Sequence, residues 1–224
     1  MFAGGQAVNL AVNPSELIRA EAPPVRKTIS FLNGRLKRSM DILLVLMAAP
    51  LAVILVGLAA LAIKLGSRGP VFFVQERLGR DRLPFLCYKL RTMVDGAEGG
   101  TPQWATARDP RVTRVGRLLR RSRLDELPQL YNVWRGEMSV VGVRPIREHF
   151  AGKLSELEPS YNLRFLVRPG LTGWDQIHNG YPCTLEGQLH KFRFDLYYLK
   201  NASFWLDLFI LGKTIAVILG CKGQ

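Results

Sequence analysis

One long apolar run dominates the hydrophobic pattern of the chain. Residues 42–63 carry no charged side chain, and Pro50 lies among them. A straight helix of this length extends about 33 Å at ~1.5 Å per residue, which matches the hydrocarbon core of a bilayer. Length alone therefore favours a single helix that crosses a membrane.

Two features of this run favour a re-entrant anchor over a crossing helix. Pro50 removes a backbone hydrogen bond and kinks a helix. Both flanks are also basic, whereas a crossing helix has one basic flank because Lys and Arg stay on the cytoplasmic side. The basic residues are Arg35, Lys37 and Arg38 before the run and Lys64, Arg68, Arg77 and Arg80 after it. We therefore predict that residues 34–68 form a re-entrant, monotopic anchor broken at Pro50. Asp41, at its start, is expected to be solvated at the interface or paired with Arg38.

The pattern then changes to that of a small β-hairpin. Residues 71–76 and 85–90 are predicted strands, with a turn at 79–82 between them. Lys89 and Arg91 lie on one face of the second strand, which is either a solvated face or a phosphate-binding one. A Gly/Pro-rich loop follows over residues 94–110.

Residues 111–123 have the pattern of a basic amphipathic helix. Six arginines occur in these 13 residues without an acidic partner. Since a solvated helix usually mixes in acidic partners, the cluster indicates that phosphate or lipid headgroups lie nearby. The whole chain supports an anionic partner, because 31 Lys and Arg outnumber 18 Asp and Glu and give a net charge of +13. The three cysteines and three histidines show neither a CxxC pair nor metal-ligand spacing, which argues against a disulfide framework or a zinc site.

Asp125 and Glu126 follow the arginines directly. Pro128 is tolerated in the first turn of a helix, so we expect a helix that begins near Asp125 and continues through Trp134. Adjacent helical residues face different directions, so one carboxylate is able to face a substrate while the other holds Mg²⁺. Asp is a nucleophile that accepts phosphoryl groups, and nearby arginines neutralise phosphate charge. The alternative is that the two acids only cap the helix and interact with its dipole.

Several motifs together resemble the bacterial sugar transferases, the monotopic phosphoglycosyl transferases. They are Tyr88-Lys89, Arg120 with Leu124-Asp-Glu-Leu-Pro-Gln129, Met138-Ser with Val141-Gly-x-Arg-Pro145, Arg168-Pro-Gly-x-Thr-Gly-Trp174, and Asp195-Leu-Tyr-Tyr with Lys200-Asn-x-Ser203. The resemblance extends from about Lys37 to the C-terminal residues.

The resemblance implies a reaction and roles for individual residues. Such enzymes transfer a sugar 1-phosphate from a UDP-sugar to polyprenyl phosphate, usually undecaprenyl phosphate, and release UMP, as the first membrane step of exopolysaccharide or other surface glycan assembly. It implies that Asp125 is the nucleophile that forms an aspartyl-phosphosugar intermediate, and that Glu126 shares Mg²⁺ with it. Lys89, Arg120, Arg144 and Gln129 are the implied phosphate- and substrate-binding residues, and Pro50 matches the proline that breaks the re-entrant helix.

The sequence departs from the family pattern at four places. Ala49 stands where Ser is usual before Pro50, Val143 replaces the first Pro of Gly-Pro-Arg-Pro, Asp175 replaces Ala after Trp174, and Asn179-Gly180 is shifted by one residue. The last two changes lie where the resemblance implies the nucleotide or sugar.

We therefore expect a mostly helical α+β chain in three parts. Residues 1–33 form a poorly ordered tail, with a short helix capped by Ser15, and residues 34–68 form the anchor. Residues 69–224 form a cytosolic catalytic domain at the inner (cytoplasmic) membrane. The apolar segment 204–219, with Trp205 at headgroup level, is an interfacial helix or, equally well, a core helix.

One other function remains open at this point. A basic, membrane-anchored module that binds anionic lipid or protein partners explains the charge and the anchor, but not the Asp-Glu pair. A nucleic-acid partner is not expected, because no recognition module is present. The sequence leaves the sugar and the oligomeric state open, a homodimer included.

Overall fold

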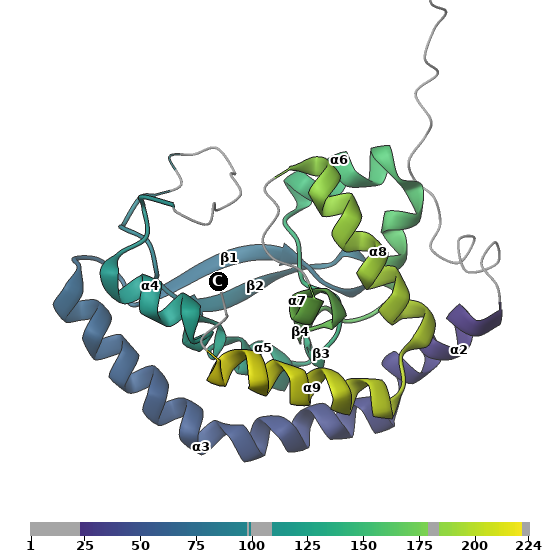
Figure 1. Cartoon of the computed structure of the whole chain (residues 1–224), viewed down its shortest axis with the longest axis horizontal. Helices are drawn as coiled ribbons and strands as arrows, with labels where there is room; N and C mark the ends of the chain where they lie inside the picture. The colour runs from purple at the N-terminus through teal and green to yellow at the C-terminus, as the bar shows by residue number, and fades with distance from the viewer. Residues whose placement is uncertain (1–22, 98, 100–108, 179–183, 221–224) are drawn as a thin grey trace, which may run out of the picture.

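The computed structural model describes residues 23–97, 99, 109–178 and 184–220. These residues form an α+β fold that is mostly helical, as predicted, with two small two-stranded sheets (Figure 1). The α-helices are α2 (Pro23–Leu32), α3 (Arg35–Gly66), α4 (Arg114–Arg121), α5 (Gln129–Arg135), α6 (Glu148–Leu157), α7 (Trp174–His178), α8 (Leu185–Asn201) and α9 (Phe204–Leu219). The strands are β1 (Phe72–Leu78), β2 (Pro84–Leu90), β3 (Ser139–Val141) and β4 (Gly170–Thr172), and 3₁₀ turns are η1 (Arg80–Arg82), η2 (Leu124–Glu126) and η3 (Pro159–Leu166).

Helix α3 contains the long apolar run. The prediction that it is broken at Pro50 is wrong, because the helix continues through this residue. It is one continuous helix of 32 residues with Pro50 inside it. Figure 1 shows that it bends along the lower side of the molecule instead. Pro50 removes one hydrogen bond of the helix, and helix-favouring neighbours such as Ala49 before it and Leu51 after it keep the chain helical on both sides of the proline.

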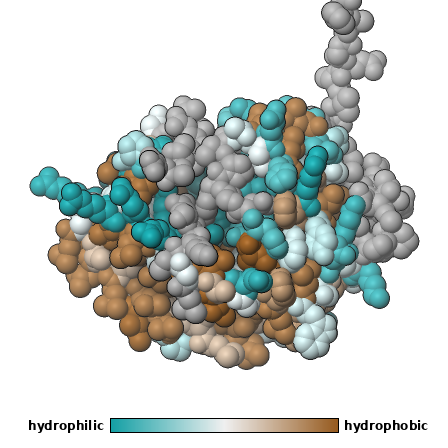
Figure 2. Space-filling view, in the orientation of Figure 1, coloured by the Kyte–Doolittle hydropathy of each residue, from teal (hydrophilic) through white to brown (hydrophobic). Residues whose placement is uncertain are grey.

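The outer face of α3 is apolar and exposed. Met47, Val53 and Leu65 are 71%, 71% and 80% exposed, and hydrophobic residues gather over this helix in Figure 2. A helical stretch over residues 26–66 is long and apolar enough to cross a bilayer. A soluble protein seldom exposes so large an apolar face, so α3 indicates association with a membrane.

Both ends of α3 are bound to the rest of the molecule. Near its start, Arg38 donates hydrogen bonds to the carbonyl oxygens of Val133 and Trp134 at the end of α5. At its other end, Arg91 of the segment after β2 donates to the carbonyl oxygens of Ser67 and Arg68. The folded part of the chain that follows α3 therefore holds the helix at both ends.

A buried charge cluster fixes the first turns of α3. Lys37 lies 2.8 Å from Asp207 of α9 and 3.5 Å from Asp41 one turn along α3. Asp41 also accepts hydrogen bonds from the Ser139 hydroxyl and the Val140 backbone N–H of β3. The expectation that Asp41 is solvated or paired with Arg38 is therefore wrong, because β3 and α9 fold over it.

The β1–β2 hairpin agrees with the sequence prediction. Its strands are antiparallel, with Phe73 opposite Lys89 and Glu76 opposite Leu86. The turn contains Asp81 and Arg82, both in the left-handed region of backbone conformation. The hairpin places Lys89 and Arg91 beside η2 and the end of α3, respectively.

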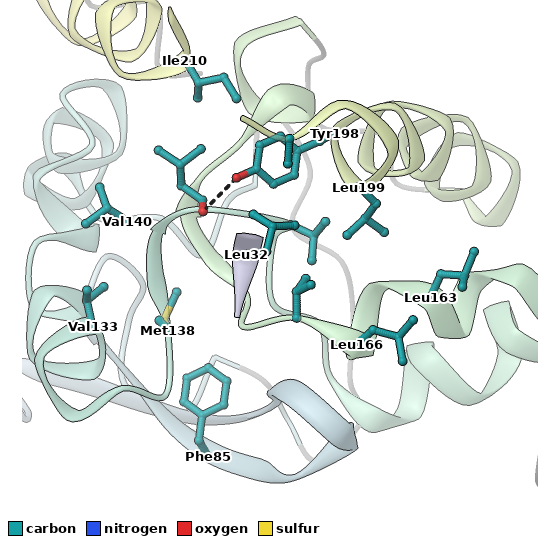
Figure 3. Packing of buried hydrophobic residues seen from close by; sticks show 14 of the residues in the cluster. Leu32, Phe85, Val133, Met138, Val140, Leu163, Leu166, Tyr198, Leu199 and Ile210 are labelled. Carbon is teal, nitrogen blue, oxygen red and sulfur yellow. Dashed lines mark hydrogen bonds between the residues drawn. The ribbon is translucent and has the colours of Figure 1, made fainter. Parts of the chain in front are cut away.

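The main core surrounds the parallel β3–β4 pair. Figure 3 shows apolar side chains from α2, α5, α8 and α9 converging on these strands, with Tyr198 donating a hydrogen bond to the Val141 carbonyl oxygen. The two loops next to the strands approach very closely, and a Cβ on Gly170 would lie 2.2 Å from the backbone nitrogen of Gly142. Glycine at both positions is therefore a packing requirement, and the resulting contact holds the turn that carries Arg144.

Helix α2 corrects the predicted N-terminal tail. Residues 1–22, including the predicted helix capped by Ser15, lie outside the described residues, but residues 23–32 form a helix instead of a poorly ordered segment. Leu32 is buried in the main core, and the Thr28 hydroxyl donates to the Leu199 carbonyl oxygen of α8. Its apolar side supplies the packing energy that a free tail lacks.

Helix α9 has one buried side and one exposed apolar side. Asp207 and Ile210 are fully buried, whereas Trp205 is 76% exposed and Phe209 is 48% exposed. This division combines the two alternatives, because the helix contributes to the core on one face and presents aromatic residues outward on the other.

Candidate active site

A cavity of about 690 Å³ lies between the hairpin, η2 and the helical part formed by α6, α7 and α8. Both acids of the predicted dyad line it, together with three of the predicted phosphate-binding residues. The charged residues that line it are Arg77, Lys89, Arg91, Asp95, Arg111, Arg120, Arg123, Asp125, Glu126, Arg144, Arg147, Arg164, Asp175, Lys191 and Asp195. The fold thus brings Lys89, Arg120, Asp125, Glu126 and Arg144 to one site from four separate segments.

Glu126 is held by three cations. Its Oε1 atom lies 2.7 Å from Lys89 Nζ and 2.6 Å from Arg144 Nη2, and its Oε2 atom lies 3.6 Å from Arg123 Nη1. Burial alone would raise the pKa of this carboxyl, but Arg144, Lys89 and Arg123 together hold its pKa well below the usual range. Glu126 is therefore a fixed negative charge that orients the basic residues of the site.

Asp125 has a different environment from its neighbour. It is 8% exposed and lines the cavity, and its carboxylate makes no hydrogen bond or ion pair with the residues that the structure describes. Burial, and after it the adjacent Glu126 charge, raise the pKa of Asp125 to about 6 against the opposing attraction of Lys89 and Arg120. A carboxylate that lines the cavity without a partner is available to an incoming ligand.

The segment around the dyad differs in detail from the predicted helix. Asp125 and Glu126 lie in the 3₁₀ turn η2, and α5 begins only at Gln129. Arg123, before the turn, has a left-handed backbone conformation. This reversal ends α4 and directs the Arg123 side chain back to Glu126, three residues later.

Asn132 of α5 fixes this turn against the hairpin. Its side chain donates to the Leu86 carbonyl oxygen and to Glu137, and it accepts a hydrogen bond from the Tyr88 backbone N–H. Because Tyr88 precedes Lys89, these bonds set the spacing between Lys89 and Glu126. The sequence contained no signal for this role, because a single Asn in a helix is usually a surface residue.

The six arginines of residues 111–123 do not act as one unpaired cluster. Arg111 lies before α4, not on it, and pairs with Asp109 at 2.6 Å, while Arg120 donates to the Thr92 hydroxyl. The predicted helix is shorter, because Thr113 caps it by accepting a hydrogen bond from Gly116 N–H. The three arginines that lie outside the cavity, Arg114, Arg117 and Arg121, are exposed.

Arg120 and Gln129 differ in their relation to the cavity. Arg120 lines it, and its Nη1 atom is buried without a hydrogen-bond partner among the described residues. Gln129 is also buried, at 2% exposure, but it is not among the residues that line the cavity. A direct contact between Gln129 and a ligand therefore stays a prediction, whereas Arg120 is positioned for an anion.

Arg164 and Asp195 form a second group of charges that sequence reasoning missed. Arg164 Nη2 lies 3.2 Å from Asp195 Oδ2 and donates a 2.6 Å hydrogen bond to the Arg144 carbonyl oxygen. Burial raises the pKa of Asp195 to about 7 despite the attraction of Arg164. Arg164 thereby supports the turn from which Arg144 reaches Glu126. Asp195 was noted only as part of a motif, and Arg164 stands in an apolar stretch that gave no functional signal.

The donor set of the dyad fits Mg²⁺ as a site completed by substrate. The described residues contain no cluster of three or more His, Cys, Asp or Glu side chains that would bind a metal alone. Mg²⁺ typically takes one or two carboxylates and fills the remaining positions with phosphate oxygens and water. The Asp125 carboxylate and the Oε2 atom of Glu126 would be these carboxylate ligands, since Oε2 has only the longer contact with Arg123.

Comparison with known families gives a match over most of the chain. Residues 32–221 match the bacterial sugar transferase family. The matched residues include α3, the hairpin and the dyad.

Curated relatives have related names. The chain is 44% identical over 184 residues to a UDP-N-acetylgalactosamine-undecaprenyl-phosphate N-acetylgalactosaminephosphotransferase of Aeromonas hydrophila, covering 82% of this chain and 44% of that protein. It is 42% identical over 189 residues to a UDP-glucose:undecaprenyl-phosphate glucose-1-phosphate transferase of Escherichia coli K12, covering 84% and 41%. A protein of the same name from Caulobacter vibrioides is 42% identical over 185 residues, covering 82% and 69%. The chain thus spans less than half the length of the first two relatives.

Proposed function

The chain belongs to the bacterial sugar transferase family, and from this premise we propose that it transfers a sugar 1-phosphate from a UDP-sugar to polyprenyl phosphate and releases UMP. The observation that carries the proposal is the contrast between the two acids of the dyad. Glu126 is bound by three cations, whereas Asp125 lines the cavity without a partner among the described residues. The names of the relatives support the same class of substrates.

In the first step, an Asp125 carboxylate oxygen attacks the phosphorus that carries the sugar. A new bond forms between this oxygen and phosphorus, and the bond to the bridging oxygen breaks, so UMP leaves with that oxygen and its electron pair. Lys89, Arg120 and Arg144 line the same cavity as Asp125, where they would neutralise the charge that spreads over the phosphoryl oxygens. In the second step, a phosphate oxygen of polyprenyl phosphate attacks the same phosphorus and displaces Asp125, which leaves a polyprenyl-diphosphate sugar.

We propose Mg²⁺ as the cofactor of this chemistry. Held by Asp125, Glu126 and substrate phosphate oxygens, it would neutralise phosphate charge and assist departure of UMP. The chain's own cations orient the phosphates, and Glu126 keeps Lys89 and Arg144 in place.

We also propose that α3 is re-entrant and that the catalytic part lies on the cytoplasmic face. A helix that crosses the bilayer would separate its two ends by the membrane thickness. Contacts of Arg38 and Arg91 with one folded body support the opposite arrangement, in which both ends stay on one side. The exposed apolar side of α9, with Trp205, is suited to the adjoining interface.

The membrane position has a mechanistic reason. The phosphate of the lipid acceptor lies at the headgroup plane, so the nucleophile must be held at the same depth. An anchor that enters and leaves one leaflet keeps Asp125 there, whereas a crossing helix would only tether the domain. The product would then enter exopolysaccharide or another surface glycan.

The test is UMP release with purified chain in detergent or nanodiscs, with Mg²⁺, polyprenyl phosphate and either UDP-N-acetylgalactosamine or UDP-glucose. We expect release to require all three components and to be abolished in Asp125→Asn. Intact-mass analysis without acceptor should detect a phosphosugar adduct that Asp125→Asn lacks. Undiminished turnover in Asp125→Asn would refute the assignment of the nucleophile.

The binding-module alternative makes a distinct prediction. It requires that no UDP-sugar releases UMP and that binding to anionic lipid survives in Asp125→Asn. The same preparations distinguish the two functions, because vesicle binding and UMP release are measured independently.

A further inference from the structure

The wall of the cavity formed by α7 and α8 is chemically different from the rest of the cavity. Asp175 of α7 and Gln188, Lys191 and Asp195 of α8 line the same space as Asp125. Asp175 and Asp195 are only 4% and 6% exposed. These are polar side chains built into the fold, not solvated surface groups.

The charges of this wall compensate one another. Lys191 Nζ lies 3.6 Å from Asp175 Oδ2, and Arg164 Nη2 lies 3.2 Å from Asp195 Oδ2. Each acid thus faces a base, so the charges of this part of the cavity offset one another. This wall presents carboxylates that accept hydrogen bonds, an ammonium group that donates them and an amide that does both.

The part of the cavity next to the dyad has the opposite character. Lys89, Arg120, Arg123 and Arg144 lie around Asp125 and Glu126, and Arg91 and Arg111 extend this basic region. An anionic diphosphate is stabilised there by charge, but gains little from a compensated wall. The wall instead suits a neutral group that carries several hydroxyls in different directions.

The position of the wall relative to α3 favours the water-soluble substrate. In Figure 1 the N-terminal half of α8 lies at the top of the molecule, whereas α3 extends along the bottom. The exposed apolar face of α3 marks the membrane side, so the wall belongs to the side facing water. The lipid chain of an acceptor has no reason to reach it.

We propose that Asp175, Gln188 and Lys191 form the sugar subsite, in which they hydrogen-bond the hydroxyl or acetamido groups of the sugar and select which UDP-sugar is used. This inference rests on the proposed function. A uracil ring presents flat apolar faces and favours aromatic or aliphatic contacts, and the aromatic side chains that line the cavity, Phe72, Phe73 and Phe150, come from β1 and α6. The sugar is the substrate group whose hydrogen-bonding directions match the wall.

The experiment compares two UDP-sugars on matched variants. UMP release is measured from UDP-glucose and UDP-N-acetylgalactosamine with the wild-type chain, Gln188→Ala and Lys191→Gln. Gln188→Ala leaves no buried charge unpaired, so it keeps the test valid if Lys191→Gln unfolds. Glu186→Gln is the control, because Glu186 lies exposed on the same helix and does not line the cavity.

We expect the two wall variants to raise KM for the preferred UDP-sugar by about tenfold and to change the ratio of kcat/KM between the two sugars, since a buried hydrogen-bonding group discriminates strongly. Product inhibition by UMP should remain within twofold of wild type, and Glu186→Gln should match wild type throughout. These results together would identify a subsite that reads the sugar and not the nucleotide.

Three outcomes would overturn the proposal in distinguishable ways. Weaker UMP inhibition with an unchanged sugar ratio would assign the wall to the nucleotide. Unchanged KM, ratio and inhibition in both folded variants would show that the wall does not contact substrate. A wild-type chain that neither binds nor turns over any UDP-sugar in a wider screen would overturn the proposed function, and the subsite with it.

Discussion

Lys37→Met tests the buried charge cluster that joins α3 to the rest of the molecule. The Lys37 side chain is 3% exposed and faces two buried carboxylates, at 2.8 Å from Asp207 and 3.5 Å from Asp41. Asp41 keeps hydrogen bonds from β3, and Asp207 keeps one from Tyr198 at 2.7 Å. Without the ammonium group, two negative charges would share one buried space.

The expected cost follows from this geometry. Removing one partner of a buried ion pair destabilises a protein by about 3–5 kcal/mol, because the remaining charge is left uncompensated. A chain of roughly 150–250 residues loses about 2–4 °C in Tm for each kcal/mol. Lys37→Met should therefore lower Tm by about 6–20 °C. Met retains much of the apolar stem, so lost volume contributes little.

The assay is thermal unfolding followed by circular dichroism in one detergent, at equal protein concentration. Lys64→Met is the matched control, since Lys64 is an exposed residue of the same helix whose ammonium group donates to the Gly69 carbonyl oxygen. We expect the control to change stability by less than about 1 kcal/mol. The double variant Lys37→Met/Asp207→Asn should recover part of the loss, because it removes one of the stranded charges.

The pH dependence gives a second check on the same variant. Burial raises the pKa of Asp207 although Lys37 and Tyr198 oppose the shift. Without Lys37 the pKa must rise further, so the variant regains stability as the pH falls and the carboxyl takes up a proton. A Tm within 2 °C of wild type at pH 8, or strictly additive effects in the double variant, would refute the reasoning.

Three further predictions concern the site and the anchor. Glu126→Gln should lower kcat for UMP release by about 100-fold, because Lys89 and Arg144 lose the charge that orients them; a change below threefold would contradict this role. Asp195 has a pKa raised to about 7, above its unfolded value, so its contribution to stability is present at low pH and is lost as the pH rises through 7. Wild-type Tm should accordingly fall relative to Asp195→Asn between pH 5 and pH 8, and parallel Tm profiles of the two proteins would rule this out. Pro50→Leu restores a helical hydrogen bond and should move α3 toward a crossing orientation. The orientation is measured by labelling single cysteines, placed before and after α3, from each side of the membrane. Two cytoplasmic flanks in the variant would show that Pro50 does not determine the orientation of α3.

Local sequence patterns predicted the elements whose cause is local. Alternating residues predicted the hairpin strands, and the length of the apolar run predicted the long helix. The Gly/Pro-rich loop before residue 111 marked the start of the helical region that contains α4. The boundaries of α4 and η2 differ from the prediction, because Thr113 caps α4 and Arg123 adopts a left-handed backbone conformation that ends it. The α2 helix was missed because its stability comes from packing on α8, not from its own pattern.

The sequence by itself determined which chemical groups the site contains. Motif order and residue types predicted Asp125, Glu126, Lys89, Arg120 and Arg144, which the fold brings to one cavity, and the apolar run predicted the long helix α3. Tertiary structure alone decided how these groups differ. It locks Glu126 among three cations and leaves Asp125 open to the cavity, it buries Asp41 with Lys37 and Asp207, and it turns Asp175 and Lys191 into one cavity wall. The physical reason is that burial, ion pairing and pKa depend on distances between segments that are far apart in the chain, and no local pattern encodes those distances.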